Sequence, residues 1–73
     1  MSKSVYAKDY REIINHLKQA RIDAGLSQQA VAAQLGKPQS YVSKIESGER
    51  RLDVVEIKKF AEIYKKDISY FIK

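Results

Sequence analysis

Two short segments with helical periodicity meet at Gly36, and this joint restricts the fold more than any other feature of the sequence. Only Lys37 and Pro38 lie between Gly36 and Gln39, where the second segment begins. Glycine adopts the left-handed backbone conformation that ends a helix without a steric penalty. Helices joined by so short a turn cross at about 90 to 120°. The sequence therefore predicts two steeply crossed helices around Gly36.

The rest of the sequence predicts three further helices. Apolar residues recur at helical spacing in residues 9–24 and 52–64, and residues 68–72 are apolar enough to dock as a short fifth helix. Ser27 is a favourable N-cap for a helix over residues 27–35, and Pro38 suits the first turn of a helix over residues 38–47. We expect an all-α fold, a compact five-helix bundle forming one domain over residues 1–73. Residues 1–8 are predicted to form a flexible N-terminal arm.

Composition narrows the class of protein. The 73 residues include no cysteine, which excludes a disulfide scaffold and a thiolate metal site. The N-terminal sequence MSKSVYAKDY lacks the apolar segment of a signal peptide, and no apolar run approaches the roughly 20 residues that span a bilayer. We therefore expect a cytoplasmic protein without a membrane partner. The net charge of +5 is typical of a nucleic-acid binder, although acidic and basic residues are interspersed.

One face of the helix over residues 38–47 carries polar side chains without acidic residues. At about 100° per residue, Tyr41, Val42 and Ile45 share the inward side of this helix. The opposite side carries Gln39, Ser40, Ser43, Lys44 and Ser47. Glutamine can pair with adenine through two hydrogen bonds, and lysine can pair with guanine. The face is therefore suited to reading DNA bases, and a solvated helix surface rich in Ser and Gln is the alternative.

Catalysis is not expected. His16 is the only histidine, and no serine, cysteine or aspartate stands at a spacing that would complete a catalytic group. Aspartate and glutamate do not cluster as metal ligands, and no glycine-rich phosphate loop is present. The sequence therefore predicts neither an enzyme nor a bound metal or cofactor.

A set of short motifs follows in a fixed order along most of the chain. They are LKQAR (17–21), GLSQ (25–28), VA (31–32), LG (35–36), VSKIE (42–46) with Gly48, and FA (60–61). Together these motifs resemble the phage-repressor and Cro type of helix-turn-helix family, the lambda-repressor-like DNA-binding domains of XRE-like regulators. The resemblance spans roughly residues 17–71 and implies the five-helix fold of that family.

The resemblance also implies roles for individual residues. The base-reading positions correspond to Gln39, Ser40 and Lys44. The positions that contact DNA phosphates or the groove wall correspond to Gln28, Tyr41, Ser43, Ser47, Arg50 and Arg51. Gln28 lies in the first turn of a helix, where the helix dipole favours an anion. Arg21 and Glu46 match a partly buried salt bridge, and Glu46 borders the apolar face, where an unpaired carboxylate would be costly.

The chain departs from the family pattern in two places. Pro38 replaces a residue that often caps the third helix with a hydroxyl, so the specificity of relatives does not transfer directly. Lys65 and Lys66 stand where relatives tend to have glycine and an apolar residue. We therefore expect the fourth helix to run slightly past its usual end.

The resemblance implies a sequence-specific regulator of transcription, a repressor that binds a palindromic operator on double-stranded DNA as a symmetric homodimer. Two half-sites would lie about 34 Å apart. The candidate dimer interface is formed by Tyr70, Phe71 and Ile72, unless these residues simply close the core. An antitoxin or a restriction-modification controller, each with a further protein partner, remains an alternative, as does an activator. RNA binding is disfavoured because no aromatic-studded sheet is predicted.

Overall fold

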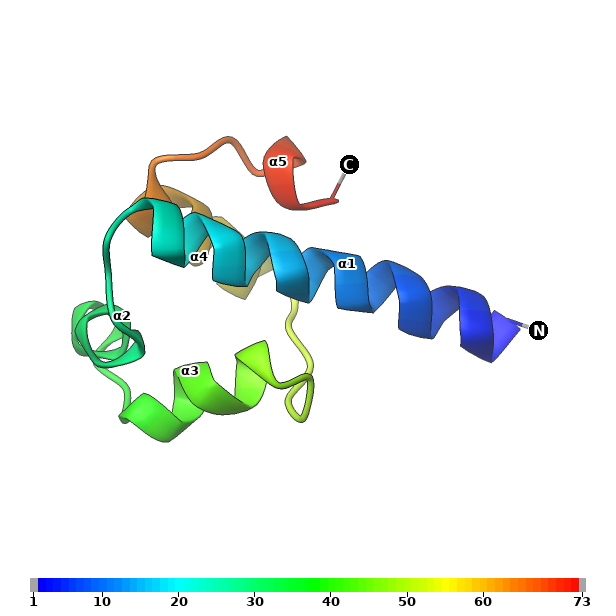
Figure 1. Cartoon of the computed structure of the whole chain (residues 1–73), viewed down its shortest axis with the longest axis horizontal. Helices are drawn as coiled ribbons and strands as arrows, with labels where there is room; N and C mark the ends of the chain where they lie inside the picture. Colours follow the sequence, from blue (N-terminus) through cyan, green and yellow to red (C-terminus); the bar gives the residue numbers. More distant parts are fainter. Residues whose placement is uncertain (1, 73) are drawn as a thin grey trace.

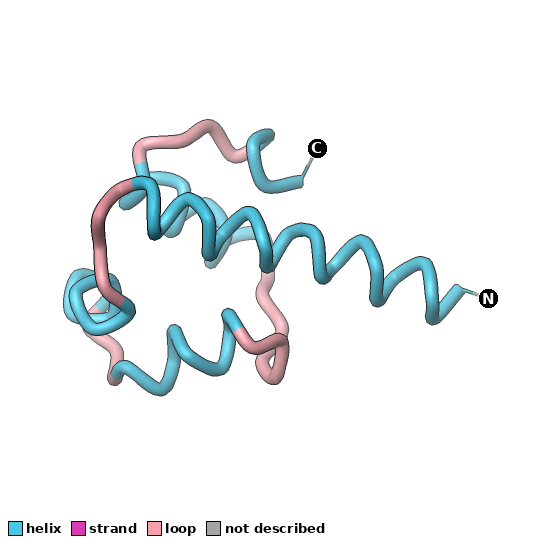
Figure 2. Tube along the Cα trace, viewed as in Figure 1, coloured by secondary structure: helices cyan, strands magenta, loops and turns pink. Residues whose placement is uncertain are grey.

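The computed structural model describes the backbone of residues 2–72 and the side chains of residues 10–71. Over this range the backbone forms helices joined by short loops, without strands (Figure 2). The helices are α1 Ser2–Asp23, α2 Gln28–Leu35, α3 Gln39–Glu46, α4 Val54–Tyr64 and α5 Ser69–Ile72 (Figure 1). The predicted all-α fold of five helices is confirmed. Within the described part of the chain, none of the helices has the length and apolarity needed to cross a membrane.

Helix α1 begins earlier than the sequence pattern predicted. It starts at Ser2 rather than at Asp9, and Figure 1 shows its N-terminal end extending past the other helices. Residues 2–9 contain neither glycine nor proline, so nothing in the local backbone chemistry stops the helix. The apolar periodicity begins only at Tyr10, which is why the pattern placed the start too late. Residues 2–8 are therefore helical, and the flexibility expected of residues 1–8 stays a prediction.

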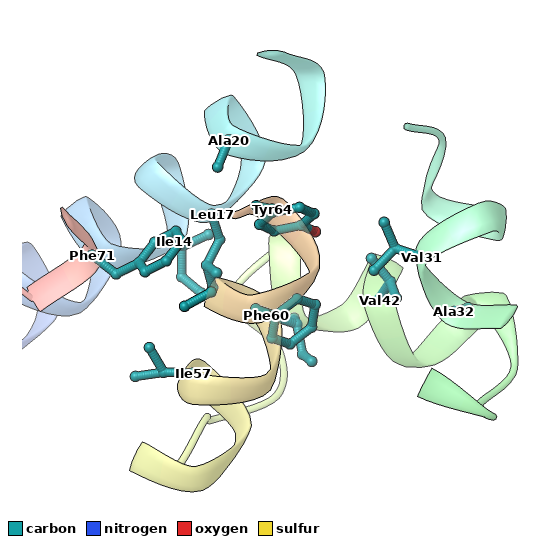
Figure 3. Close-up of a cluster of buried hydrophobic side chains, with 12 residues drawn as sticks. Ile14, Leu17, Ala20, Val31, Ala32, Val42, Ile57, Phe60, Tyr64 and Phe71 are labelled. Carbon is teal, nitrogen blue, oxygen red and sulfur yellow. The ribbon is translucent and has the colours of Figure 1, made fainter. Parts of the chain in front are cut away.

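Helix α1 is the element around which the others pack. It contacts α3, α4 and α5, while α2 contacts α3. Figure 3 shows side chains of α1, α4 and α5 meeting those of α2 and α3 in one cluster. The buried members are Ile14, Leu17, Ala20, Val31, Ala32, Val42, Ile45, Ile57, Phe60, Ala61, Tyr64 and Phe71. Each large apolar side chain in this cluster stabilises the fold by about 1.5–3 kcal/mol.

The turn between α2 and α3 has the expected glycine geometry. Gly36 has a φ of 69°, and the amide of Lys37 donates to the carbonyl of Ala32 over 2.9 Å. Pro38 then lies just before α3 in an extended conformation, and its side chain makes no capping hydrogen bond. In Figure 1 α2 is seen end-on while α3 lies across the view, so the two helices cross steeply. The predicted helix-turn-helix arrangement is therefore present.

Helix α4 is held at both ends by local hydrogen bonds. At its start Asp53 accepts from the amide of Glu56 over 2.8 Å, and the Glu56 carboxylate accepts from the amide of Asp53 over 3.0 Å. At its end α4 stops at Tyr64, and Lys65 takes a left-handed conformation with a φ of 58°. The amide of Lys66 then donates to the carbonyl of Ala61 over 2.9 Å. The expectation that this helix runs on was wrong, because the left-handed conformation of Lys65 ends the helix.

We predict that Lys65→Gly stabilises the protein. A residue with a Cβ pays about 1–2 kcal/mol in the left-handed region, and glycine avoids this cost while losing part of the gain to chain entropy. We expect a net gain of about 0.5–1 kcal/mol, which corresponds to a melting temperature higher by roughly 4 °C. Thermal unfolding followed by circular dichroism measures this change. Lys66→Gly is the matched control, because Lys66 does not have a positive φ, and an equal gain in both variants would contradict the explanation.

Candidate nucleic-acid interface

Helix α3 presents one buried side and one exposed side. Val42 and Ile45 are fully buried, and Val31 of α2 is buried in the same cluster. This packing fixes how α3 is rotated about its own axis. All five polar residues predicted on the outer side are exposed: Gln39, Ser40, Ser43, Lys44 and Ser47. Amide, hydroxyl and ammonium groups therefore reach solvent together from one helix face.

Gln28 of α2 connects the first turn of α3 to the interior. Its Oε1 accepts from Nε2 of Gln39 over a long 3.5 Å. Its Nε2 donates to Oε1 of Glu46 over 2.9 Å. Gln28 is half-buried, whereas Gln39 is exposed. The structure thus brings together Gln28, predicted at a phosphate, and Gln39, predicted at a base.

Arg21 and Glu46 form a two-pronged ion pair between the end of α1 and the end of α3. Arg21 Nε donates to Glu46 Oε2 over 2.7 Å, and Nη2 donates to Oε1 over 3.1 Å. Nη1 of Arg21 also donates to the carbonyl of Leu26 over 2.9 Å. The side chains are 14% and 5% exposed. The hydrogen bond with Glu46 raises the pKa of Arg21, outweighing the opposing effect of burial.

A second carboxylate, Glu56 of α4, holds the other side of α3. Its Oε2 accepts from the Tyr41 hydroxyl over 2.6 Å and pairs with Arg50 Nη1 over 3.0 Å. Burial, together with the hydrogen bond to Glu56, raises the pKa of Tyr41 to about 12. Partial burial would raise the pKa of Glu56, but hydrogen bonds from Tyr41 and Asp53 and the charge of Arg50 hold it below its ordinary value.

Glu56 was not among the predicted site residues. The spacing of Asp53 and Glu56 is that of a helix capping box and could have been read from the sequence. Its contacts with α3 have no sequence signal, because they depend on where α4 packs. Tyr41 and Arg50, both predicted to contact DNA, therefore already have partners within the protein.

The loop after α3 carries both exposed and restrained groups. The hydroxyl of Ser47 lies 3.0 Å from the carbonyl of Lys44 and 3.1 Å from a carboxylate oxygen of Glu49. The Tyr10 hydroxyl donates to the carbonyl of Arg50 over 2.7 Å and so ties the loop to α1. Arg51 is exposed, with its guanidinium 5.5 Å from the centre of the Tyr10 ring. Arg51 is thus the more accessible of the two arginines.

The C-terminal segment differs from the predicted dimer interface in one respect. Phe71 is only 1% exposed and belongs to the core, so it offers no surface to a partner. A helix of four residues is not stable alone, and Phe71 is what anchors α5. Tyr70 is half-buried, with its ring 5.5 Å from that of His16. The side chain of Ile72 lies outside the described residues.

Among residues 10–71, whose side chains the structure describes, no three or more histidine, cysteine, aspartate or glutamate side chains are grouped to hold an ion.

Comparisons with known proteins agree with this arrangement. A family model described as Helix-turn-helix matches residues 17–71. A solved structure of an XRE-family like protein from Pseudomonas syringae pv. tomato str. DC3000 superimposes with a TM-score of 0.90 at 39% sequence identity. The match covers 97% of this chain and 87% of the other. No curated protein matches the sequence.

We predict that Arg21→Ala destabilises the fold. The substitution leaves the Glu46 carboxylate, whose side chain is 5% exposed, with Gln28 as its remaining side-chain partner. Removing one partner of such a pair costs about 2–3 kcal/mol after allowance for partial exposure. Urea unfolding measures the loss. Arg11→Ala, an exposed change on the same helix, is the control and stays within about 0.5 kcal/mol of wild type. Equal midpoints for both variants would rule out a structural role for Arg21.

Proposed function

The chain belongs to the XRE family of helix-turn-helix DNA-binding transcription regulators, and on this basis we propose that it is a sequence-specific repressor that reads the major groove with α3. The observation that carries the proposal is the exposed face of α3. Gln39, Ser40 and Lys44 reach solvent from this face, while Gln28 links Gln39 to the partly buried Arg21–Glu46 pair. A face of hydrogen-bonding groups held by a rigid interior is suited to base recognition.

Phosphate contacts would position the protein on the duplex. The groups we assign to the phosphates or the groove wall are Gln28, Tyr41, Ser43, Ser47, Arg50 and Arg51. Gln28 is the first residue of α2, where unpaired backbone amides favour an anion. The cation of Arg51 is exposed and so is available to a phosphate. These contacts fix the register of α3 in the groove but carry no sequence information themselves.

We further propose that the protein acts as a symmetric homodimer on a palindromic operator. A single recognition helix covers too few base pairs to define an operator, and two half-sites one helical turn apart solve this problem. Tyr70 on α5 is the described residue through which a second copy would be contacted. Such a protein would work in the cytoplasm of a bacterial or phage-type system, in association with the nucleoid.

Selection of bound sequences from a random duplex library tests the function. We expect enrichment of a palindrome with half-site centres about 10 base pairs apart. Light scattering on the complex should then show two protein chains per duplex. Enrichment of a single, non-repeated site would contradict the dimer, and a library that stays random would contradict sequence-specific binding.

We predict different effects for Lys44→Ala and Arg51→Ala. Loss of a base contact should cost about 1–3 kcal/mol on the selected operator and relax the preference at one base position. Loss of a phosphate contact should weaken binding to all duplexes alike and reduce the salt slope of the affinity by about 0.9. Titrations on operator and on random duplex measure both effects. If both variants lost the same affinity on both duplexes, Lys44 would not be a base reader.

A further inference from the structure

The carboxylate of Glu56 contacts both α3, through Tyr41, and the arginine-rich loop after it, through Arg50. Its carboxylate is reached by the Tyr41 hydroxyl at 2.6 Å, by Arg50 Nη1 at 3.0 Å and by the Asp53 amide at 3.0 Å. The guanidinium of Arg50 also lies 4.7 Å from the centre of the Tyr41 ring. Arg50 is therefore held by a negative charge and an aromatic surface together.

The Arg50–Glu56 pair can open at little cost. The Arg50 side chain is 42% exposed and that of Glu56 is 19% exposed, so solvent screens the attraction. When Arg50 leaves, the carboxylate keeps its hydrogen bonds from Tyr41 and Asp53. Neither group is then left buried without a partner, and the usual penalty for breaking an ion pair does not apply.

Arg50 has other basic side chains near it. Lys37 Nζ approaches the other partner of Arg50, the Tyr41 ring, at 5.4 Å from its centre. Lys44 and Arg51 are exposed on α3 and on the loop. Cations thus lie before α3, in its last turn and in the loop after it, and Glu56 pairs with one of them, Arg50.

We propose that Glu56 weakens binding to the DNA backbone by competing with phosphate for Arg50, an inference that rests on the proposed function. In the free protein Arg50 pairs with Glu56. On DNA, Arg50 exchanges this carboxylate for a phosphate. Breaking the Arg50–Glu56 pair costs part of the free energy that Arg50 gains from the phosphate. This cost is the same on every duplex sequence. Glu56 is thus a positioning residue that lowers non-specific affinity.

Glu56→Gln tests the proposal, because the glutamine carbonyl can keep the capping-box bond from the Asp53 amide while its NH2 group donates to the Tyr41 hydroxyl, and the charge is lost. We expect binding to a random duplex to strengthen about threefold to fivefold at about 0.15 M salt, the range that a surface ion pair supports. The salt slope should steepen by less than the 0.9 of a full phosphate contact, because Arg50 reaches phosphate in both proteins and only the wild type leaves a free carboxylate behind. Melting temperatures of all variants are recorded alongside.

The matched control is Glu62→Gln, which changes the net charge equally at an exposed position of α4 beside Lys59 and Gln34. We expect Glu62→Gln to change the salt slope of the DNA affinity only slightly. Equal gains from Glu56→Gln and Glu62→Gln would overturn the proposal, since net charge alone would explain them. In the Arg50→Ala/Glu56→Gln double variant the gain should disappear, and a gain that persisted would show that Arg50 is not involved.

Arg50→Ala alone supplies a measurement that does not depend on how Glu56→Gln folds. It should reduce the wild-type salt slope by less than a full phosphate contact, because Glu56 already offsets part of it. An unchanged slope would overturn the proposal, because Arg50 would not reach phosphate at all. Failure of the wild-type chain to bind any duplex would instead overturn the proposed function itself.

Discussion

The orientation of α3 depends on the ion pair between Arg21 and Glu46. Helices α2 and α3 have eight residues each, too few to be stable alone, so their placement comes from tertiary contacts. Val42 and Ile45 supply the apolar contact, but such packing is not directional. The guanidinium adds direction, because its donors reach Glu46 and the Leu26 carbonyl at the same time. One side chain thus fixes the end of α1, the loop before α2 and the end of α3.

The pair organises the fold more than it stabilises it. Removing two charges from water costs about as much as their attraction returns, so a well-packed apolar pair would serve stability equally well. An apolar pair, however, would offer no hydrogen-bond acceptor to Gln28. Oε1 of Glu46 accepts from both Arg21 and Gln28, and Gln28 in turn meets Gln39. Hydrogen bonds therefore connect the partly buried Arg21–Glu46 pair to Gln28, and a longer contact of 3.5 Å connects Gln28 to the exposed Gln39.

Local chemistry was predictable and placement was not. The helix ends at Gly36 and at the other glycines could be predicted from backbone sterics. The buried side of α3 could be predicted from its apolar periodicity. The start of α1 was missed because no residue before Tyr10 marks it. The end of α4 at Tyr64 agrees with the periodicity of residues 52–64, but the expected extension is absent because Lys65 adopts a conformation that lysine rarely takes. The contact between Tyr41 and Glu56 joins residues 15 apart in sequence and exists only once α4 has packed.

Glu46 and Glu56 both hold α3, the helix proposed to face DNA. Because the two carboxylates are buried to different degrees, we expect them to affect DNA binding differently. Glu46 is nearly buried and bonded on both oxygens, so separating it from Arg21 would leave a charge with little access to solvent. Glu56 is more exposed and shares Arg50 with the solvent. A charge that opposes only a backbone contact lowers affinity on all sequences, whereas the base contacts of the operator are unaffected. Because the loss is the same on operator and on random duplex, the ratio of specific to non-specific affinity stays unchanged while the protein binds every duplex less tightly.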